Sequence, residues 1–113
     1  MYTGMKNDMM LSILVCDDDK YFFEILRDYL CKNMYFNKSD FLYSGNKEDM
    51  LKTYRKVKPD LVFMDIEVGE DIGFDIIREL LKEGYSPQVV YITNYDYYVF
   101  DAFVGQPLGF VRK

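Results

Sequence analysis

The sequence feature that most constrains the fold is a short apolar run that recurs along the chain and ends each time in a polar residue. Three such runs cover 11–16, 61–64 and 89–92, and two shorter strand-like segments cover 41–43 and 110–112. Continuous apolar runs of this length are typical of strands that are buried on both faces of a parallel sheet. We therefore expect five strands with helices covering both faces of the sheet they form.

The segments between these runs carry apolar residues at helical spacing, which predicts four amphipathic helices with one buried face each. The expected buried faces consist of Phe22, Ile25, Leu26, Tyr29 and Leu30; Met50, Leu51, Tyr54 and Val57; Gly73, Ile76, Ile77, Leu80 and Leu81; and Tyr97, Phe100, Phe103 and Val104. Asn46 is suited to cap the second helix, and Pro59 is suited to end it.

Strands that alternate with helices at this spacing form βαβ units with right-handed crossovers. The sequence thus predicts an α/β fold, a doubly wound parallel five-stranded sheet with the flavodoxin-like strand order 2-1-3-4-5. The 113 residues have room for one such domain. Ligands of these sheets bind beyond the carboxyl ends of the strands, near the point where the strand order reverses.

Polar side chains suited to metal and phosphate stand at these strand ends. They are Asp17, Asp18 and Asp19 after the first strand, Asp65 after the third, Thr93 after the fourth and Lys113 after the fifth. Because the first and third strands are neighbours in the predicted order, we expect Asp17, Asp18 and Asp65 to converge. Three close carboxylates raise one another's pKa unless a cation neutralises them, and the oxygen donors favour Mg²⁺.

Such a site is suited to phosphoryl transfer. A bound Mg²⁺ clamps the oxygens of the transferring group, which makes Asp65 a candidate nucleophile. The Thr93 hydroxyl and the Lys113 ammonium group are suited to hold the same oxygens. Asp19 taken alone is better interpreted as a helix N-cap, whereas the adjacent pair Asp17 and Asp18 is not explained by capping.

The composition excludes several other classes of site. The sequence has no histidine, which rules out histidine acid/base catalysis, Ser/His triads and histidine zinc sites. It has 19 acidic and 14 basic residues and a formal net charge of −5. This surplus of acid argues against a nucleic-acid-binding surface in this segment, since phosphate contacts need basic residues.

The two cysteines, Cys16 and Cys31, lack CxxC spacing and lie in apolar segments, where small buried thiols are common. No apolar run is long enough to span a bilayer, and residues 1–10 do not have the pattern of a signal peptide. We therefore expect a reduced, cytoplasmic protein without a membrane partner.

Three stretches of the sequence resemble the receiver domain of bacterial response regulators. They read "ILVCDDD", "LVFMDIEVGEDIGFDIIREL" and "VVYITNYDYYVFDAFVGQPLGFVRK", and the last is most similar to regulators with a LytTR-type DNA-binding domain. The resemblance implies an N-terminal extension over 1–9 and a receiver domain over 10–113. That domain would stop after its fifth strand, without the family's fifth helix.

The same resemblance implies roles for the acidic residues. Asp65 matches the phosphorylated aspartate, Asp18 a direct Mg²⁺ ligand and Asp17 a neighbour that acts largely through water. Glu67 matches the residue whose main-chain carbonyl completes the metal shell. Gly69 stands in a loop where the family often has proline, which is a departure from its pattern.

The resemblance also implies a switch. Thr93 matches the switch hydroxyl, Lys113 the lysine of the phosphate site and Gly73 the glycine of the phosphoacceptor loop. Phe110 matches the aromatic residue that changes rotamer with the hydroxyl, although it lacks the more usual tyrosine hydroxyl.

The function implied is a receiver that a histidine kinase phosphorylates on Asp65 with Mg²⁺. Phosphorylation would change how the face built from the fourth helix and fifth strand binds a partner copy. Binding to DNA would take place through an output domain beyond Lys113. One alternative is a receiver that acts alone, without an output domain. Another is a small Mg²⁺-dependent phosphatase with an aspartyl-phosphate intermediate, although "DIEVG" places Glu67 where such enzymes carry a second aspartate.

Overall fold

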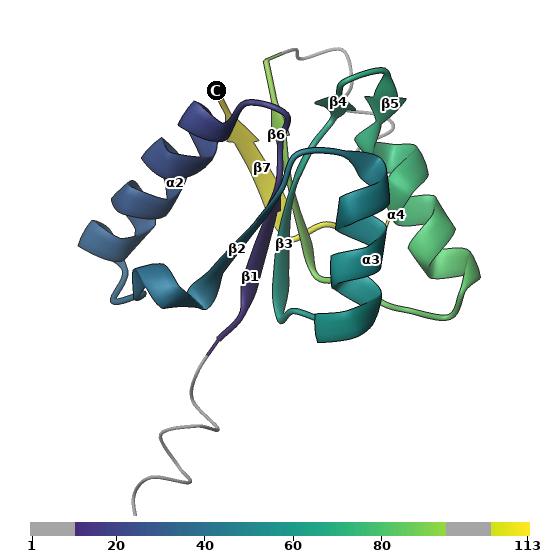
Figure 1. Cartoon of the computed structure of the whole chain (residues 1–113), viewed down its shortest axis with the longest axis horizontal. Coiled ribbons are helices and arrows are strands. Elements are labelled where there is room, and N and C mark those ends of the chain that lie inside the picture. The colour runs from purple at the N-terminus through teal and green to yellow at the C-terminus, as the bar shows by residue number, and fades with distance from the viewer. Residues whose placement is uncertain (1–10, 95–104) are drawn as a thin grey trace, which may run out of the picture.

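The computed structural model describes residues 11–94 and 105–113, which form a parallel five-stranded sheet with helices on both sides (Figure 1). Its strands are β1 (Ile13–Cys16), β2 (Phe41–Ser44), β3 (Leu61–Asp65), β6 (Val89–Thr93) and β7 (Gly109–Arg112). They lie in the order β2-β1-β3-β6-β7, and each neighbouring pair is parallel. The predicted α/β class and the order 2-1-3-4-5 are confirmed.

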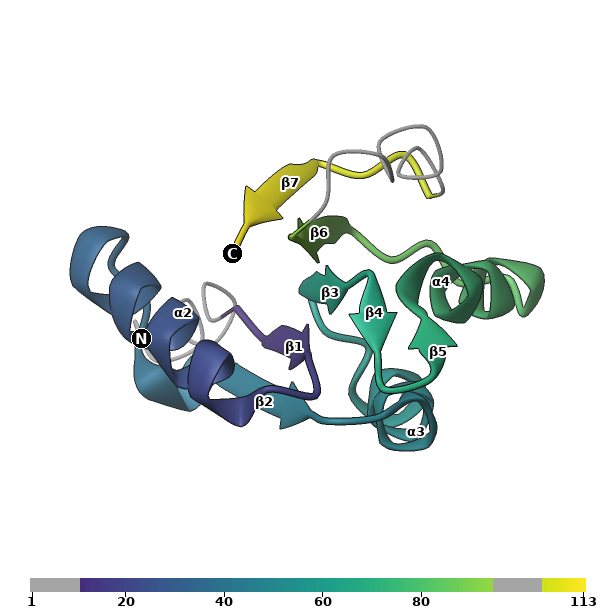
Figure 2. The ribbon, with the colours of Figure 1, turned by 90° about the horizontal axis from the view of Figure 1, so that it is seen from above.

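The helices in the described part of the chain are α2 (Lys20–Asn33), α3 (Lys47–Val57) and α4 (Gly73–Lys82), with one 3₁₀ turn, η1 (Lys38–Asp40). Seen from above, α2 lies against one face of the sheet, and α3 and α4 lie against the other (Figure 2). A short antiparallel hairpin of β4 (Glu67–Val68) and β5 (Asp71–Ile72) fills the connection between β3 and α4. The sequence interpretation had only a loop there.

Successive residues of each strand point to opposite faces, and this alternation divides the core into two clusters. The α2-side cluster consists of Ile13, Val15, Phe23, Leu26, Leu30, Phe41, Phe63 and Ile92. The α3/α4-side cluster includes Leu14, Cys16, Met50, Leu51, Tyr54, Val62, Met64, Phe74, Ile76, Ile77, Leu80 and Tyr91. The strands next to the site are therefore apolar on both faces until they end in carboxylates.

The ends of the helices follow from local hydrogen bonding. Oδ1 of Asp19 accepts hydrogen bonds from the amides of Tyr21 and Phe22, so Asp19 is the N-cap of α2. Asn46 caps α3 as predicted, with its side-chain oxygen 2.8 Å from the Asp49 amide nitrogen. The last residue of α3 is Val57, and the next residue already has a positive φ of 50°.

Four residues expected on buried helix faces are exposed, which corrects the sequence prediction. Ile25, Tyr29, Val57 and Leu81 are 48%, 62%, 41% and 38% exposed, respectively. Each helix touches the sheet along a single line, so only a narrow stripe is covered. In α2 that stripe is Phe23, Leu26 and Leu30. It begins at Phe23, one residue after the predicted start at Phe22.

The strand ends also differ slightly from the prediction. β1 begins at Ile13, two residues after the start of the predicted run at Leu11. Asp65 and Thr93 are the last residues of β3 and β6 instead of following them, and β2 and β7 gain Ser44 and Gly109. The helix predicted around Tyr97, Phe100, Phe103 and Val104 lies outside the described residues. Within 11–94 and 105–113, each helix is too short or too polar to cross a bilayer.

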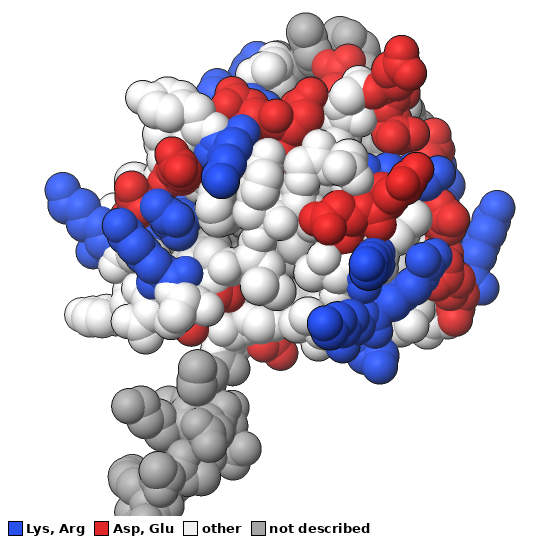
Figure 3. All heavy atoms as spheres, viewed as in Figure 1, with Lys and Arg blue, Asp and Glu red and all other residues white. Residues whose placement is uncertain are grey.

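The charged side chains at the two ends of α3 complement its helix dipole. The first turn of α3 carries Glu48 and Asp49, and its last turn carries Arg55 and Lys56, an arrangement that complements the partial charges of the two ends. Figure 3 shows acidic side chains along the top of the molecule, where the strands end, and down its right side, with groups of basic side chains at the left and at the lower right. The edge that receives the carboxyl ends of the strands is therefore acidic.

Candidate functional site

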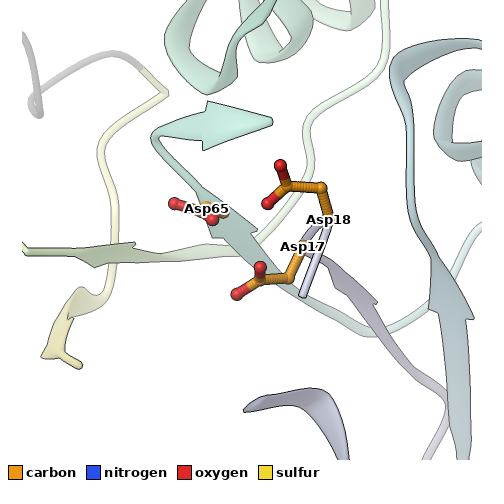
Figure 4. Close-up of side chains that lie close together, drawn as sticks. All are labelled: Asp17, Asp18 and Asp65. Atoms are coloured by element: carbon orange, nitrogen blue, oxygen red, sulfur yellow. The ribbon is translucent and has the colours of Figure 1, made fainter. Parts of the chain in front are cut away.

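Three carboxylates meet at the carboxyl end of the sheet. One oxygen from each of Asp17, Asp18 and Asp65 lies within 4.8 Å of the others, and the three groups face a common space (Figure 4). Asp17 directly follows β1, and Asp65 ends the neighbouring strand β3. Asp17 is fully buried, Asp65 is 5% exposed and Asp18 is exposed. The switch point of the sheet thus holds the three residues that the sequence singled out.

Lys113 supplies a positive charge to this group. Its Nζ lies 3.1 Å from Oδ2 of Asp65, and 3.2 and 3.1 Å from Oδ1 and Oδ2 of Asp17. Its main-chain amide donates a hydrogen bond of 3.1 Å to the carbonyl oxygen of Thr93, and its side chain is only 17% exposed. The ammonium group contacts two of the three carboxylates, and its single positive charge leaves the cluster of Asp17, Asp18 and Asp65 with an excess of negative charge.

Burial and charge together change the protonation of the site. Burial, together with the charge of the neighbouring Asp17 carboxylate, raises the pKa of Asp65 to about 7, because the hydrogen bond from the Glu67 amide and the Lys113 ammonium group lower it by less. Burial would lower the pKa of Lys113, but its hydrogen bonds to Asp17 and Asp65 raise the pKa above the usual lysine value. Without another cation, Asp65 therefore holds a proton over part of the neutral range.

Cys16 lies beside these carboxylates but does not share their chemistry. It is fully buried in the α3/α4-side cluster. Burial, followed by the charges of Asp65 and Asp17, raises the pKa of its thiol. The thiol stays protonated at neutral pH and is a core group, in agreement with the sequence interpretation.

The donor set fits a hard divalent cation. Oδ1 of Asp17 accepts a hydrogen bond of 2.9 Å from the Asp19 amide, and its buried Oδ2 lies 3.1 Å from the Lys113 ammonium group. Asp18 and Asp65 each use one oxygen to accept a backbone amide, from Gly69 and Glu67 respectively. All the donors are oxygens and the charge is negative, which are the properties that Mg²⁺ requires.

The other predicted site residues lie on β4, β6 and β7. Glu67 begins β4, and its amide donates a hydrogen bond of 3.1 Å to Oδ1 of Asp65. Thr93 ends β6, and its carbonyl oxygen accepts a hydrogen bond from the Lys113 amide next to the site. Phe110 is 46% exposed and its ring lies 6.4 Å from that of Tyr91 in a stacked arrangement. The roles proposed for these residues stay predictions.

Two contacts of the site were absent from the sequence interpretation. The Phe22 ring lies against Lys113, with 5.0 Å from Nζ to the ring centroid, although the sequence marked Phe22 only as a core residue. Gly73, at the start of α4, donates a backbone hydrogen bond to Ile66 and packs against the carbonyl group of Asp65. Phe22 falls three residues after the cap Asp19, which is the only signal that places it near the site.

A family comparison decides what kind of domain carries this site. The model of the response regulator receiver domain matches residues 13–113. The chain belongs to this family. It is a receiver domain of a two-component response regulator, as its motifs indicated.

Individual relatives agree. The receiver domain is 36% identical over 107 residues to the sensory transduction protein LytT of Bacillus anthracis, covering 92% of this chain and 42% of that protein. It is 32% identical over 111 residues to LytT of Bacillus subtilis (strain 168), with the same coverage. The chain thus spans less than half the length of the curated relatives it matches.

Solved structures show the same fold. Response regulator TrrA of Thermotoga maritima, solved in complex with Mg²⁺ and BeF, is 25% identical with a TM-score of 0.74, over 92% of this chain and 87% of that one. The receiver domain of a Luxo repressor protein from Vibrio parahaemolyticus is 15% identical with a TM-score of 0.76, over 93% and 79%. The receiver domain therefore shares its architecture with proteins of quite different sequence.

Proposed function

We propose that this receiver domain accepts a phosphoryl group on Asp65 from a histidine kinase and requires Mg²⁺ for the reaction. The observation that carries the proposal is the position of Asp65. Its buried carboxylate lies next to Asp17 and Asp18 and 3.1 Å from the Lys113 ammonium group, which also contacts Asp17. A nucleophilic oxygen, a set of metal ligands and a fixed cation are thus present together.

Asp17, Asp18 and Asp65 would hold the Mg²⁺ ion, together with the main-chain carbonyl of Glu67. The ion would neutralise the carboxylates and clamp the oxygens of the incoming group. The relative TrrA was solved with Mg²⁺ and BeF, which supports the same assignment here.

The remaining residues of the site would position the phosphoryl group. An oxygen of Asp65 forms a bond to phosphorus while the bond from phosphorus to the donor breaks, and the donor leaves with the electron pair. Lys113 supplies a positive charge next to the oxygens that gain negative charge. The hydroxyl of Thr93 would donate a hydrogen bond to the same group and move toward it.

The new phosphoryl group adds about −1.5 to −2 charges, and this charge would act on the rest of the domain. Thr93 would move toward it and Phe110 would follow into the vacated space. The predicted homodimer face involves β7 and the helix expected at 97–104, which lies outside the described residues. The LytT relatives, which are more than twice as long as this chain, support a LytTR-type DNA-binding output beyond Lys113, with the receiver at 10–113 after an extension over 1–9.

The test uses acetyl phosphate, a small donor that needs no kinase. We expect one phosphoryl group per chain by intact-protein mass spectrometry, dependent on Mg²⁺, prevented when EDTA is present before acetyl phosphate is added, and absent from Asp65→Asn. Beryllofluoride should shift the amide resonances of Thr93 and Lys113 only when Mg²⁺ is present. Modification without Mg²⁺, or modification that persists in Asp65→Asn, would contradict the proposal, and steady turnover of p-nitrophenyl phosphate would favour a phosphatase.

A further inference from the structure

The ammonium group of Lys113 has an aromatic neighbour besides its two carboxylates. Its Nζ lies 5.0 Å from the centroid of the Phe22 ring, within the range in which a cation is attracted to a ring face. The same Nζ lies 3.1 Å from Oδ2 of Asp65 and 3.2 Å from Oδ1 of Asp17. The ammonium group is therefore enclosed by two carboxylates and one ring.

The position of Phe22 is determined by local structure within α2. Phe22 belongs to the first turn of the helix, where its amide donates a hydrogen bond of 3.2 Å to Oδ1 of the cap Asp19. Its half-buried side chain packs against the α2-side cluster. The cap thus sets the first turn of α2, and the first turn sets the place of the ring.

A lysine side chain loses much rotamer freedom when it is held in one position. A contact that restrains the Lys113 ammonium group before the reaction therefore lowers the entropy cost of holding it there during the reaction. The main chain of Lys113 is anchored to Thr93, but that bond does not orient the side chain. A further carboxylate would restrain the ammonium group and also repel an incoming phosphoryl group. An aromatic ring attracts the ammonium group without adding net charge, so it suits a site that must receive an anion.

We propose that Phe22 is a positioning residue for Lys113, which keeps the ammonium group at the Asp65 oxygens during phosphoryl transfer. The inference rests on the proposed function. With acetyl phosphate, an oxygen of Asp65 bonds to phosphorus, the bond from phosphorus to the acetate oxygen breaks, and acetate leaves with the electron pair. Phe22 acts on this step only through Lys113.

The experiment compares Phe22→Leu, which keeps an apolar side chain but removes the ring face, with Phe22→Trp, which keeps an aromatic face. Tyr21→Leu is the matched control, because Tyr21 lies in the same turn of α2 and is 70% exposed. With saturating Mg²⁺ and acetyl phosphate, we expect Phe22→Leu to be phosphorylated about threefold more slowly, as the loss of one cation–π contact predicts. Phe22→Trp and Tyr21→Leu should react at the wild-type rate.

A second measurement reports on the contact itself. In NMR spectra of the metal-free protein, the ε-methylene protons of Lys113 should show an upfield ring-current shift in the wild type and in Phe22→Trp. The shift should disappear in Phe22→Leu and remain in Tyr21→Leu. A change in helix stability alone would not produce this pattern.

The outcomes separate the two proposals. Equal rates and equal Lys113 resonances in wild type and Phe22→Leu would overturn the positioning role and leave the proposed function intact. An equal loss of rate in Phe22→Leu and Phe22→Trp would assign the effect to packing and would also overturn it. A wild-type protein that takes up no phosphoryl group would refute the proposed function and, with it, the role of Phe22.

Discussion

The amide of Gly69 donates a hydrogen bond of 3.2 Å to Oδ2 of Asp18, which joins the β4–β5 hairpin to the loop between β1 and α2. Gly69 has a φ of +60°, a conformation that glycine adopts without steric cost. The loop in which the family often has proline is therefore held by hairpin pairing and by this contact. Asp18 serves both the loop and the proposed metal site.

Removal of the Asp18 carboxylate should therefore weaken Mg²⁺ binding. We expect Asp18→Ala to raise the Mg²⁺ dissociation constant at least about tenfold, since it removes a ligand and releases the hairpin. Isothermal titration calorimetry measures this directly. Glu24→Gln removes an exposed carboxylate of α2 instead, and an equal loss of affinity in that variant would show that general charge, not the site, attracts the ion.

The raised pKa of Asp65 predicts a pH-dependent stability in the absence of metal. The pKa of Asp65 is about 7 in the folded chain, compared with an ordinary value of 3.8. The contribution of Asp65 to stability is therefore greatest at low pH and is lost as the pH rises through 7. Relative to Asp65→Asn, the wild type should lose about 2 kcal/mol between pH 4 and pH 8, after allowance for solvent screening and for coupling to Asp17.

Urea unfolding of both proteins in EDTA, at a series of pH values, measures this difference. Because the other carboxylates are present in both proteins, their titration largely cancels in the difference between the two free energies of unfolding. Added Mg²⁺ should abolish the loss, since it favours the ionised form. A difference between the two proteins that does not vary with pH would contradict the burial of Asp65.

Gly73 allows α4 to begin directly against β3. A Cβ at this position would clash with the carbonyl oxygen of Asp65 and lie 2.9 Å from Cγ of Met64. We expect Gly73→Ala to lower the free energy of unfolding by about 3 kcal/mol, measured by urea denaturation. Gly109→Ala is the control, because a Cβ there meets nothing within 4 Å, and it should change stability by less than about 0.5 kcal/mol.

Leu80 and Leu81 are adjacent in α4 but differ in burial. Leu80 is fully buried in the α3/α4-side cluster, whereas Leu81 is 38% exposed. Leu80→Ala should cost about 3 kcal/mol of stability because it leaves a cavity, and Leu81→Ala should cost less than about 1 kcal/mol. Thermal or urea unfolding distinguishes them, and similar losses would mean that the face of α4 against the sheet has been misassigned.

The strand order and the convergence of Asp17, Asp18 and Asp65 were predictable because both depend on patterns along the chain. An apolar run that ends in a carboxylate marks a buried strand and its functional end, and short crossovers restrict the order of parallel strands. The ends of the elements were less accurate, by one residue at Ser44 and Gly109. Such boundaries depend on single hydrogen bonds, which a residue pattern does not record.

The contacts of Phe22, Gly69 and Gly73 were not predictable in the same way. Each depends on how a helix or hairpin is rotated against the sheet, and the sequence contains no measure of that rotation. Ile25 shows the same limit, because helical spacing selected it for the core although only Phe23, Leu26 and Leu30 reach the sheet. Helical periodicity defines the buried stripe to within about one residue. That uncertainty is large enough to predict an exposed residue as buried in place of its neighbour.

The alternation of β1 between the two clusters makes its length critical. Ile13 and Val15 point to the α2 side, whereas Leu14 and Cys16 point to the opposite side, and Asp17 follows directly. One inserted or deleted residue in this strand would send the side chains that follow it to the wrong face and turn the acidic pair away from β3. Point substitutions can be absorbed by repacking, but a change of length here would remove the core and the site in a single step.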